Sequence, residues 1–104
     1  MDIGHAEMRG LNTSAEEMIL ALGDCLQALH LHDNDRWDDS HEIPFSMNID
    51  FNKVISALKE IKYHGYFTLE ATHYLSAFTT DTALIGLQDL ARAARRLAAM
   101  YEMV

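Results

Sequence analysis

The chain has 104 residues, 49% of them hydrophobic and 23% charged, so we expect one folded domain or part of one, not a disordered segment. Its net charge of −8 argues against nucleic acid as a partner, because binding to phosphates needs a basic surface. With a single cysteine, no apolar run near the roughly 20 residues that span a bilayer and no signal-peptide pattern, we expect a cytoplasmic protein that does not bind membranes.

The first expected elements are a helix and a short strand. Ser14 and Glu17 have the spacing of a capping box, which predicts a helix that begins there and ends at Gly23. Residues 26–31 are mostly apolar and predict a strand.

A second helix, a second strand and a third helix follow. Asp50 is the expected N-cap of a helix that Gly65 ends, and residues 66–69 predict the second strand. The last helix is expected from residue 80 or 81 to about residue 101. Because each strand is followed by a helix, we expect the strands to pair in parallel through right-handed crossovers.

The stretch from Leu29 to Pro44 carries the polar residues that indicate chemistry. It contains three histidines and five acidic residues, and its only cation is Arg36. Histidine nitrogens and carboxylate oxygens are ligands that divalent transition metals accept. Residues that follow parallel strands meet at the carboxyl edge of the sheet, so His30 or His32 should lie near Glu70. The sequence therefore predicts a metal site at this edge.

The expected elements also look like part of a larger sheet. The three helices would cover one face, whereas parallel sheets are normally covered on both. Asp2-Ile-Gly-His5 reads as the end of a strand whose apolar body is missing, so we expect a truncated unit. Glu70 is expected to be buried at its strand end. Open strand edges and an exposed sheet face would favour a homodimer or a larger oligomer.

Several short motifs, taken together, resemble the xylose-isomerase-like (β/α)8 barrels. The resemblance rests on Asp2-Ile-Gly-His5, His30-Leu-His-Asp-Asn-Asp35, Asp39-Ser-His41, Ile49-Asp-Phe51 and Gly65-Tyr-Phe-Thr-Leu-Glu70. It covers nearly the whole chain, but only about the last three β/α units of such a barrel. It implies an α/β fold in which residues 1–104 are a single C-terminal segment of a partial TIM barrel.

The resemblance implies a set of metal ligands. Asp2 matches the strand-end metal aspartate of the family, and Glu70 matches the last carboxylate ligand, which in epimerases also handles a substrate proton. His30 matches the histidine ligand by the His-Leu-x-Asp pattern, with His32 as the alternative. The implied cofactor is a divalent ion of zinc, manganese, magnesium, cobalt or iron.

Other residues match positions that contact substrate or a further metal. His5 matches a histidine that touches substrate or a second metal, so it is a catalytic and substrate-binding candidate. Asp39 and His41 match a pair that gives endonuclease IV relatives an extra metal. Arg36 lies about where epimerases hold a substrate-orienting arginine. Trp37 is a candidate wall of a sugar pocket, although loop aromatics more often only pack.

The implied function is a metal-dependent isomerase or epimerase of sugars or sugar phosphates, which removes a proton next to a carbonyl. Its partner would be a small carbohydrate. Epimerases of this kind use a second glutamate across the site, and this chain lacks it, so we expect little activity from an isolated monomer. The usual glycine-rich turn also reads Phe45-Ser-Met-Asn48 here. The alternatives are an endonuclease IV-like phosphoesterase and a non-catalytic fragment that self-associates.

Overall fold

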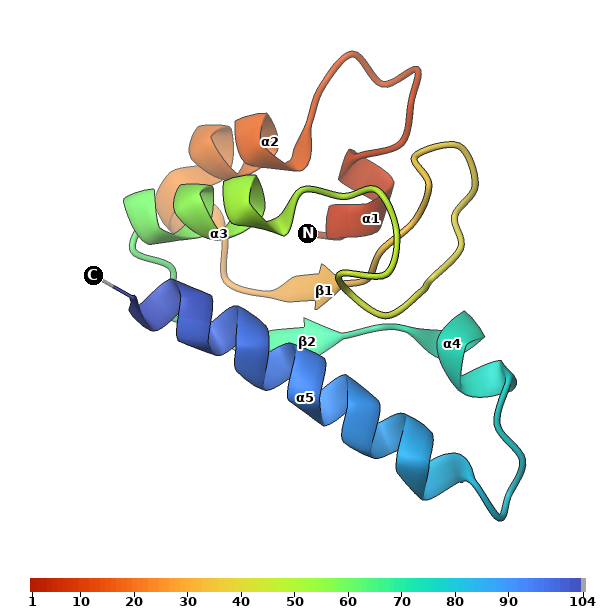
Figure 1. The fold of residues 1–104 in the computed structure, drawn as a ribbon. Helices are drawn as coiled ribbons and strands as arrows, with labels where there is room; N and C mark the ends of the chain where they lie inside the picture. Colours follow the sequence, from red (N-terminus) through yellow and green to blue (C-terminus); the bar gives the residue numbers. More distant parts are fainter. Residues whose placement is uncertain (104) are drawn as a thin grey trace.

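Two parallel strands packed against helices form the frame of the molecule, which is a computed structural model that describes residues 1–103 (Figure 1). In chain order the elements are α1 (Ile3–Ala6), α2 (Ala15–Leu22), the 3-10 helix η1 (Gly23–Cys25), β1 (Leu29–Leu31), α3 (Phe51–Glu60), β2 (Phe67–Leu69), α4 (Thr72–Ser76) and α5 (Ala83–Glu102). None of the helices in residues 1–103 is both long and apolar enough to cross a membrane.

The pairing of β1 with β2 is parallel, as predicted, and places Leu29 opposite Phe67 and Leu31 opposite Leu69. Both strands point the same way in Figure 1, so their carboxyl ends share one edge. The structure is therefore of the mixed α/β class and is compatible with part of a β/α barrel.

A third parallel segment lies on the other side of β1. Asp2 pairs with His30 in an isolated parallel bridge, and the His30 N–H donates to the Met1 carbonyl at 2.9 Å. At the strand end expected at Asp2 only this bridge forms, and the chain turns at once into α1. Asp2 caps that helix by accepting a hydrogen bond from the His5 N–H at 2.8 Å.

The two faces of the sheet differ in their cover. Leu29 and Leu31 are buried against residues of α2, α3 and α5, among them Ile19, Leu58 and Leu97. Side chains alternate along a strand, so His30 and Thr68 point to the opposite face, where both are exposed. Within residues 1–103, helices thus cover one face only, as the sequence predicts.

The end of α3 corrects the expectation that Gly65 terminates this helix. The Lys62 N–H donates to the Lys59 carbonyl at 3.1 Å, and the Tyr63 N–H donates to the Leu58 carbonyl at 3.0 Å. Lys62 has the left-handed φ of 57° that this Schellman-type ending requires. Gly65 serves packing instead, because a Cβ there would lie 2.3 Å from the Tyr63 hydroxyl.

Other boundaries differ by a few residues. The strands are shorter than predicted, and α4 was not expected. The start of α5 moves to Ala83 because Thr79 and Thr82 close a turn before it, in which the Thr79 N–H donates to Thr82 Oγ1 at 2.9 Å. Hydroxyl side chains that bind nearby backbone compete with helix formation.

We expect Leu58→Ala to lower the free energy of unfolding by about 2–5 kcal/mol, because it leaves a cavity between the sheet and the helices. Leu20→Ala, at an exposed position of α2, should change it by less than about 0.5 kcal/mol. Urea denaturation followed by circular dichroism measures both. Equal effects of the two substitutions would contradict the packing described.

Candidate metal centre

Three donor side chains gather where the parallel segments end. Asp2, His30 and Glu70 each offer one ligand atom, and these atoms lie within 4.8 Å of one another. His30 Nδ1 and Glu70 Oε2 are 2.7 Å apart. The backbone fixes this strand-end group, since the Glu70 N–H donates to the Leu31 carbonyl at 2.9 Å and His30 is bonded to Met1.

The burial predicted for Glu70 is wrong. Its side chain is 35% exposed, and that of His30 is 58% exposed. The reason is the uncovered face of the sheet, onto which both side chains project. In residues 1–103 the strand-end group therefore lies open to solvent and to any ligand that approaches from that face.

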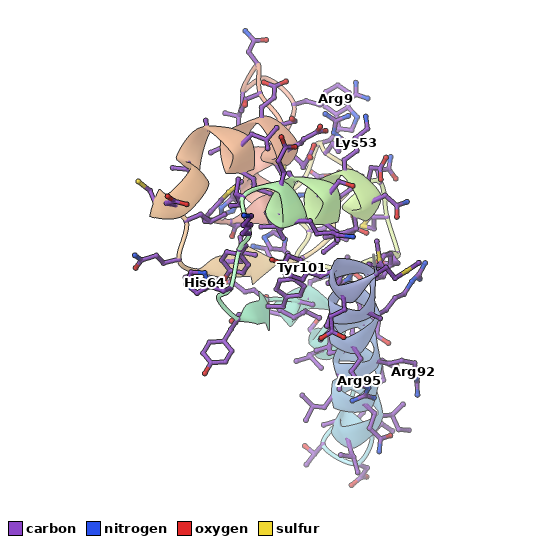
Figure 2. All side chains as sticks on the ribbon, turned by 90° about the vertical axis from the view of Figure 1, so that its left-hand side faces the viewer. Arg9, Lys53, His64, Arg92, Arg95 and Tyr101 are labelled. Atoms are coloured by element: carbon purple, nitrogen blue, oxygen red, sulfur yellow. The ribbon has the colours of Figure 1, made fainter. Side chains whose placement is uncertain are left out.

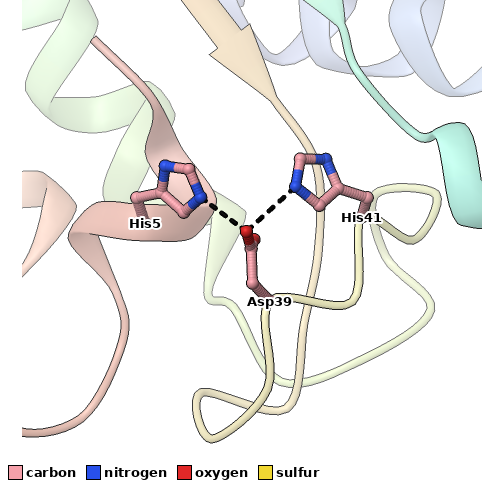
Figure 3. Close-up of side chains that lie close together, drawn as sticks. All are labelled: His5, Asp39 and His41. Carbon is pink, nitrogen blue, oxygen red and sulfur yellow. Dashed lines mark hydrogen bonds and ion pairs between the residues drawn. The ribbon is translucent and has the colours of Figure 1, made fainter.

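A second set of donors comes from α1 and the loop after β1. Asp39 Oδ2 lies 2.6 Å from His5 Nε2 and 3.1 Å from His41 Nε2 (Figure 3). These three residues, the loop group, again offer ligand atoms within 4.8 Å of one another. The two groups adjoin, because His5 Nδ1 is 3.4 Å from Asp2 Oδ2 and His41 Nδ1 is 3.1 Å from the Glu70 carbonyl oxygen.

The loop group has more hydrogen-bond acceptors than N–H groups to satisfy them. Both ring nitrogens of His5 face carboxylates, and those of His41 face Asp39 and a carbonyl oxygen, yet a neutral imidazole has only one N–H. On each neutral ring one nitrogen carries no hydrogen and faces an oxygen, so two lone pairs repel each other. A proton or a metal cation bound to that nitrogen would remove this repulsion. No lysine or arginine of residues 1–103 forms an ion pair with Asp2, Asp39 or Glu70, so the donor set fits a divalent cation.

The pKa directions agree with this geometry. The hydrogen bond to Asp39 raises the pKa of His5 above its ordinary value. Burial lowers the pKa of His41, but its bonds to Asp39 and to the Glu70 carbonyl outweigh burial and the net shift is upward. Burial raises the pKa of Asp39, and the bonds from the two imidazoles reverse this to a net lowering.

Asp33, which sequence reasoning did not single out, holds the loop that supplies Asp39 and His41. It is fully buried, and its carboxylate accepts hydrogen bonds from the N–H groups of Asn34, Met47 and Ile49 at 2.9–3.0 Å. Its backbone also pairs with Glu42 in an antiparallel bridge. These bonds fold the loop back over the strand ends. In the sequence Asp33 is the aspartate of the His-Leu-x-Asp pattern, but that pattern indicates neither its burial nor its role in the loop.

The remaining predicted residues lie outside both groups. His32 is buried behind Asp2, and the structure does not bring it into either set of donors. Arg36 Nε donates to the Glu7 carbonyl at 3.2 Å and lies 3.7 Å from the Glu7 carboxylate. Trp37 is 65% exposed, with the Arg9 guanidinium 4.3 Å from its ring centre. The structure thus gives Arg36 and Trp37 contacts to other residues and not to the donor groups.

The turn that departs from the family pattern is strained. Phe45 has a φ of 76°, in the left-handed region that favours glycine. Its ring packs 5.4 Å from that of Phe51 and carries the Arg96 guanidinium at 3.7 Å. Phe45 therefore links the loop to α3 and α5 through side-chain contacts that glycine could not make.

Two parallel strands with acid and imidazole donors at their carboxyl ends are compatible with part of a β/α barrel, in which sites form at this end of the strands. The comparison with known families agrees: the model of the xylose isomerase-like TIM barrel family matches residues 1–100. The chain belongs to this family, which confirms the resemblance seen in its motifs.

Among curated proteins, the chain is similar to the uncharacterised protein MJ1311 of Methanocaldococcus jannaschii. The two are 38% identical over 69 residues, which are 66% of this chain and 24% of the relative. The chain thus spans about a quarter of the length of that protein. No solved structure matches the chain significantly.

Each donor group should bind a divalent cation independently. In titrations of the purified protein with Co²⁺ or Zn²⁺, Glu70→Gln should weaken one binding event and Asp39→Asn the other, each by at least about tenfold. Glu60→Gln, an exposed substitution on α3, is the matched control and should change neither. Unaltered binding by both site variants would refute the assignment.

Proposed function

We propose that the chain carries part of the active site of a metal-dependent sugar or sugar-phosphate isomerase or epimerase. The observation that supports this most is the convergence of Asp2, His30 and Glu70 from three parallel segments. Membership of the xylose isomerase-like family agrees with it. A small polyhydroxylated substrate also suits a site whose donors are open to solvent on one side.

The residues of the site would bind the metal, orient the substrate and hold a proton. Asp2, His30 and Glu70 would hold the cation and leave positions for two substrate oxygens. When bound, the cation would polarise a carbonyl and so favour loss of the proton on the neighbouring carbon. His5, whose ring nitrogens face Asp2 and Asp39, would orient a substrate hydroxyl in place of one of these contacts. Glu70 would also hold a proton in transit, but a carboxylate that binds the cation is a weak base, because the cation attracts its electrons.

The proposed reaction therefore needs a further carboxylate. Within residues 1–103 the strand-end group contains no fourth donor. We propose that copies of the chain associate and cover the exposed face of the sheet, where Tyr66 is 89% exposed and Thr68 lies beside His30. An apolar groove of about 590 Å³, which is lined by Met1, Leu11 and Leu22 and reaches Asp2 and His5, offers a further contact beside the donor groups.

Light scattering should give a mass at least twice the 11.8 kDa of one chain. Thr68→Lys puts a charge on the exposed face and should shift the population toward monomer, whereas Ser56→Lys on the outer side of α3 should not. A monodisperse wild-type monomer at high concentration would exclude self-association.

The isomerase proposal is tested by exchange of substrate protons with solvent. Ketoses and ketose phosphates are incubated with the protein and Mn²⁺ or Co²⁺ in D₂O, and deuterium next to the carbonyl is measured by mass spectrometry. We expect metal-dependent exchange in the associated fraction, with Glu70→Gln lowering it at least about a hundredfold. Glu60→Gln should retain it.

Two results would overturn parts of this proposal. Turnover by a purified monomer would show that the site needs no second copy. Absence of exchange in every fraction, although metal binds, would exclude isomerase activity for this chain and leave a non-catalytic, metal-binding fragment.

A second candidate is an endonuclease IV-like phosphoesterase, which the loop group favours, because paired metal sites are typical of phosphoester hydrolysis. The charge distribution opposes it. Arg9, Lys53, Arg92 and Arg95 are exposed and spread over the outside of the molecule, as Figure 2 shows, and do not form a basic groove at the donors. Metal-dependent cleavage of abasic-site DNA without any proton exchange in sugars would favour this candidate over the isomerase.

A further inference from the structure

His32 occupies the space between the two donor groups without belonging to either. It is fully buried, its Nε2 lies 2.7 Å from Asp2 Oδ1, and its ring stacks on that of His41 at 4.1 Å with an angle of 3° between the planes. We propose that His32 is a positioning residue: its hydrogen bond orients Asp2 for metal binding, and its ring fixes His41 by stacking. This inference rests on the metal site of the proposed function.

The hydrogen bond to Asp2 has a defined direction. An ionised carboxylate only accepts, so His32 Nε2 carries the proton and donates. Among residues 1–103, Nδ1 of His32 has no hydrogen-bond partner and is shielded from solvent. A second proton there would leave a buried, unpaired N–H and a buried charge, which is costly. A proton on Nε2 therefore serves the bond to Asp2 without leaving an unpaired N–H on the buried side of the ring.

This bond decides which oxygen of Asp2 remains for a cation. Oδ1 accepts from His32 Nε2 and also from the His5 N–H at 2.8 Å. Two donors on Oδ1 hold the carboxylate in one rotamer. Oδ2 accepts from neither of these two groups and lies 3.4 Å from His5 Nδ1. An imidazole that orients a ligand carboxylate in this way raises metal affinity, because the ligand does not have to be ordered when the metal binds.

Gly4 makes room for the His32 ring. A Cβ at position 4 would lie 2.0 Å from His32 Cε1 and 2.5 Å from Nδ1, far below any tolerated contact. The Cε1 edge of the ring, with Nδ1 on one side and Nε2 (2.6 Å from that Cβ) on the other, thus packs against the backbone of α1. This is why His32, a metal-ligand alternative in the sequence analysis, is placed to position a ligand instead.

The stack on His41 gives His32 a separate role in the loop group. The parallel rings place His41 so that its Nδ1 reaches the Glu70 carbonyl and its Nε2 reaches Asp39. The His5 ring meets His32 edge-on, with centres 5.9 Å apart. One buried side chain therefore contacts members of both groups, through a hydrogen bond on one side and through ring contacts on the other.

Two substitutions separate these roles. His32→Phe keeps a flat ring beneath His41 but cannot donate to Asp2, whereas His32→Gln keeps an N–H₂ donor near Nε2 but loses the ring. Co²⁺ affinity is measured by calorimetry for the strand-end group in the Asp39→Asn background and for the loop group in the Glu70→Gln background. His64→Phe, an exposed substitution, is the matched control.

We expect His32→Phe to weaken Co²⁺ binding at the strand-end group by about ten- to a hundredfold and to leave the loop group nearly unchanged. His32→Gln should largely restore the strand-end group and weaken the loop group instead. A merely structural role would lower stability in both variants without this crossing pattern. Equal affinities in wild type and His32→Phe would overturn the proposal.

Two further measurements keep the test decisive if a variant does not fold. Gly4→Ala retains every donor but displaces the His32 ring, so it should weaken the strand-end group as His32→Phe does, and wild-type affinity there would contradict the proposal. Nitrogen-15 NMR of the metal-free wild type should show the proton of His32 on Nε2, and a proton on Nδ1 alone would refute the bond to Asp2. Failure of the wild type to bind any metal would instead overturn the proposed function itself.

Discussion

The site depends on the parallel alignment of three short segments. The bonds from His30 to Met1 and from Glu70 to Leu31 set the register, so that Asp2, His30 and Glu70 end at one edge. Side chains alternate along a strand, and a shift of one residue would send these donors to the face covered by helices. The apolar residues Leu29 and Leu31 oppose such a shift, because they are buried on that face.

Buried polar residues then convert a sheet edge into a site. The buried carboxylate of Asp33 is stabilised by hydrogen bonds from three backbone N–H groups. Asn34 donates from Nδ2 to the Gly4 carbonyl at 3.0 Å. Together they tie the loop after β1 to α1 and bring Asp39 within reach of His5. The loop group thus owes its geometry to residues that offer no ligand themselves.

The sequence predicted the parts of this structure that depend on local pattern. Ser14 and Asp50 cap helices as expected, and the strands pair in parallel. It failed where contacts distant in sequence decide. The sequence predicts that Gly65 ends α3, but the helix ends earlier, where Lys62 closes it through backbone hydrogen bonds. The pattern of charges also gives no sign that Asp33 and His32 are buried. The open position of Glu70 likewise follows from a sheet face that nothing in residues 1–103 covers.

The balance of charge around the donors links the fold to its chemistry. Asp2, Asp39 and Glu70 have imidazoles as their only ion-pair partners in residues 1–103, and His5 and His41 face acceptors on both ring nitrogens. Such an arrangement favours an added positive charge, which is why protons are held more tightly at His5 and His41. A metal cation that binds the loop group must displace those protons. The same clustering of acceptors that raises these pKa values therefore also supplies the attraction for a metal.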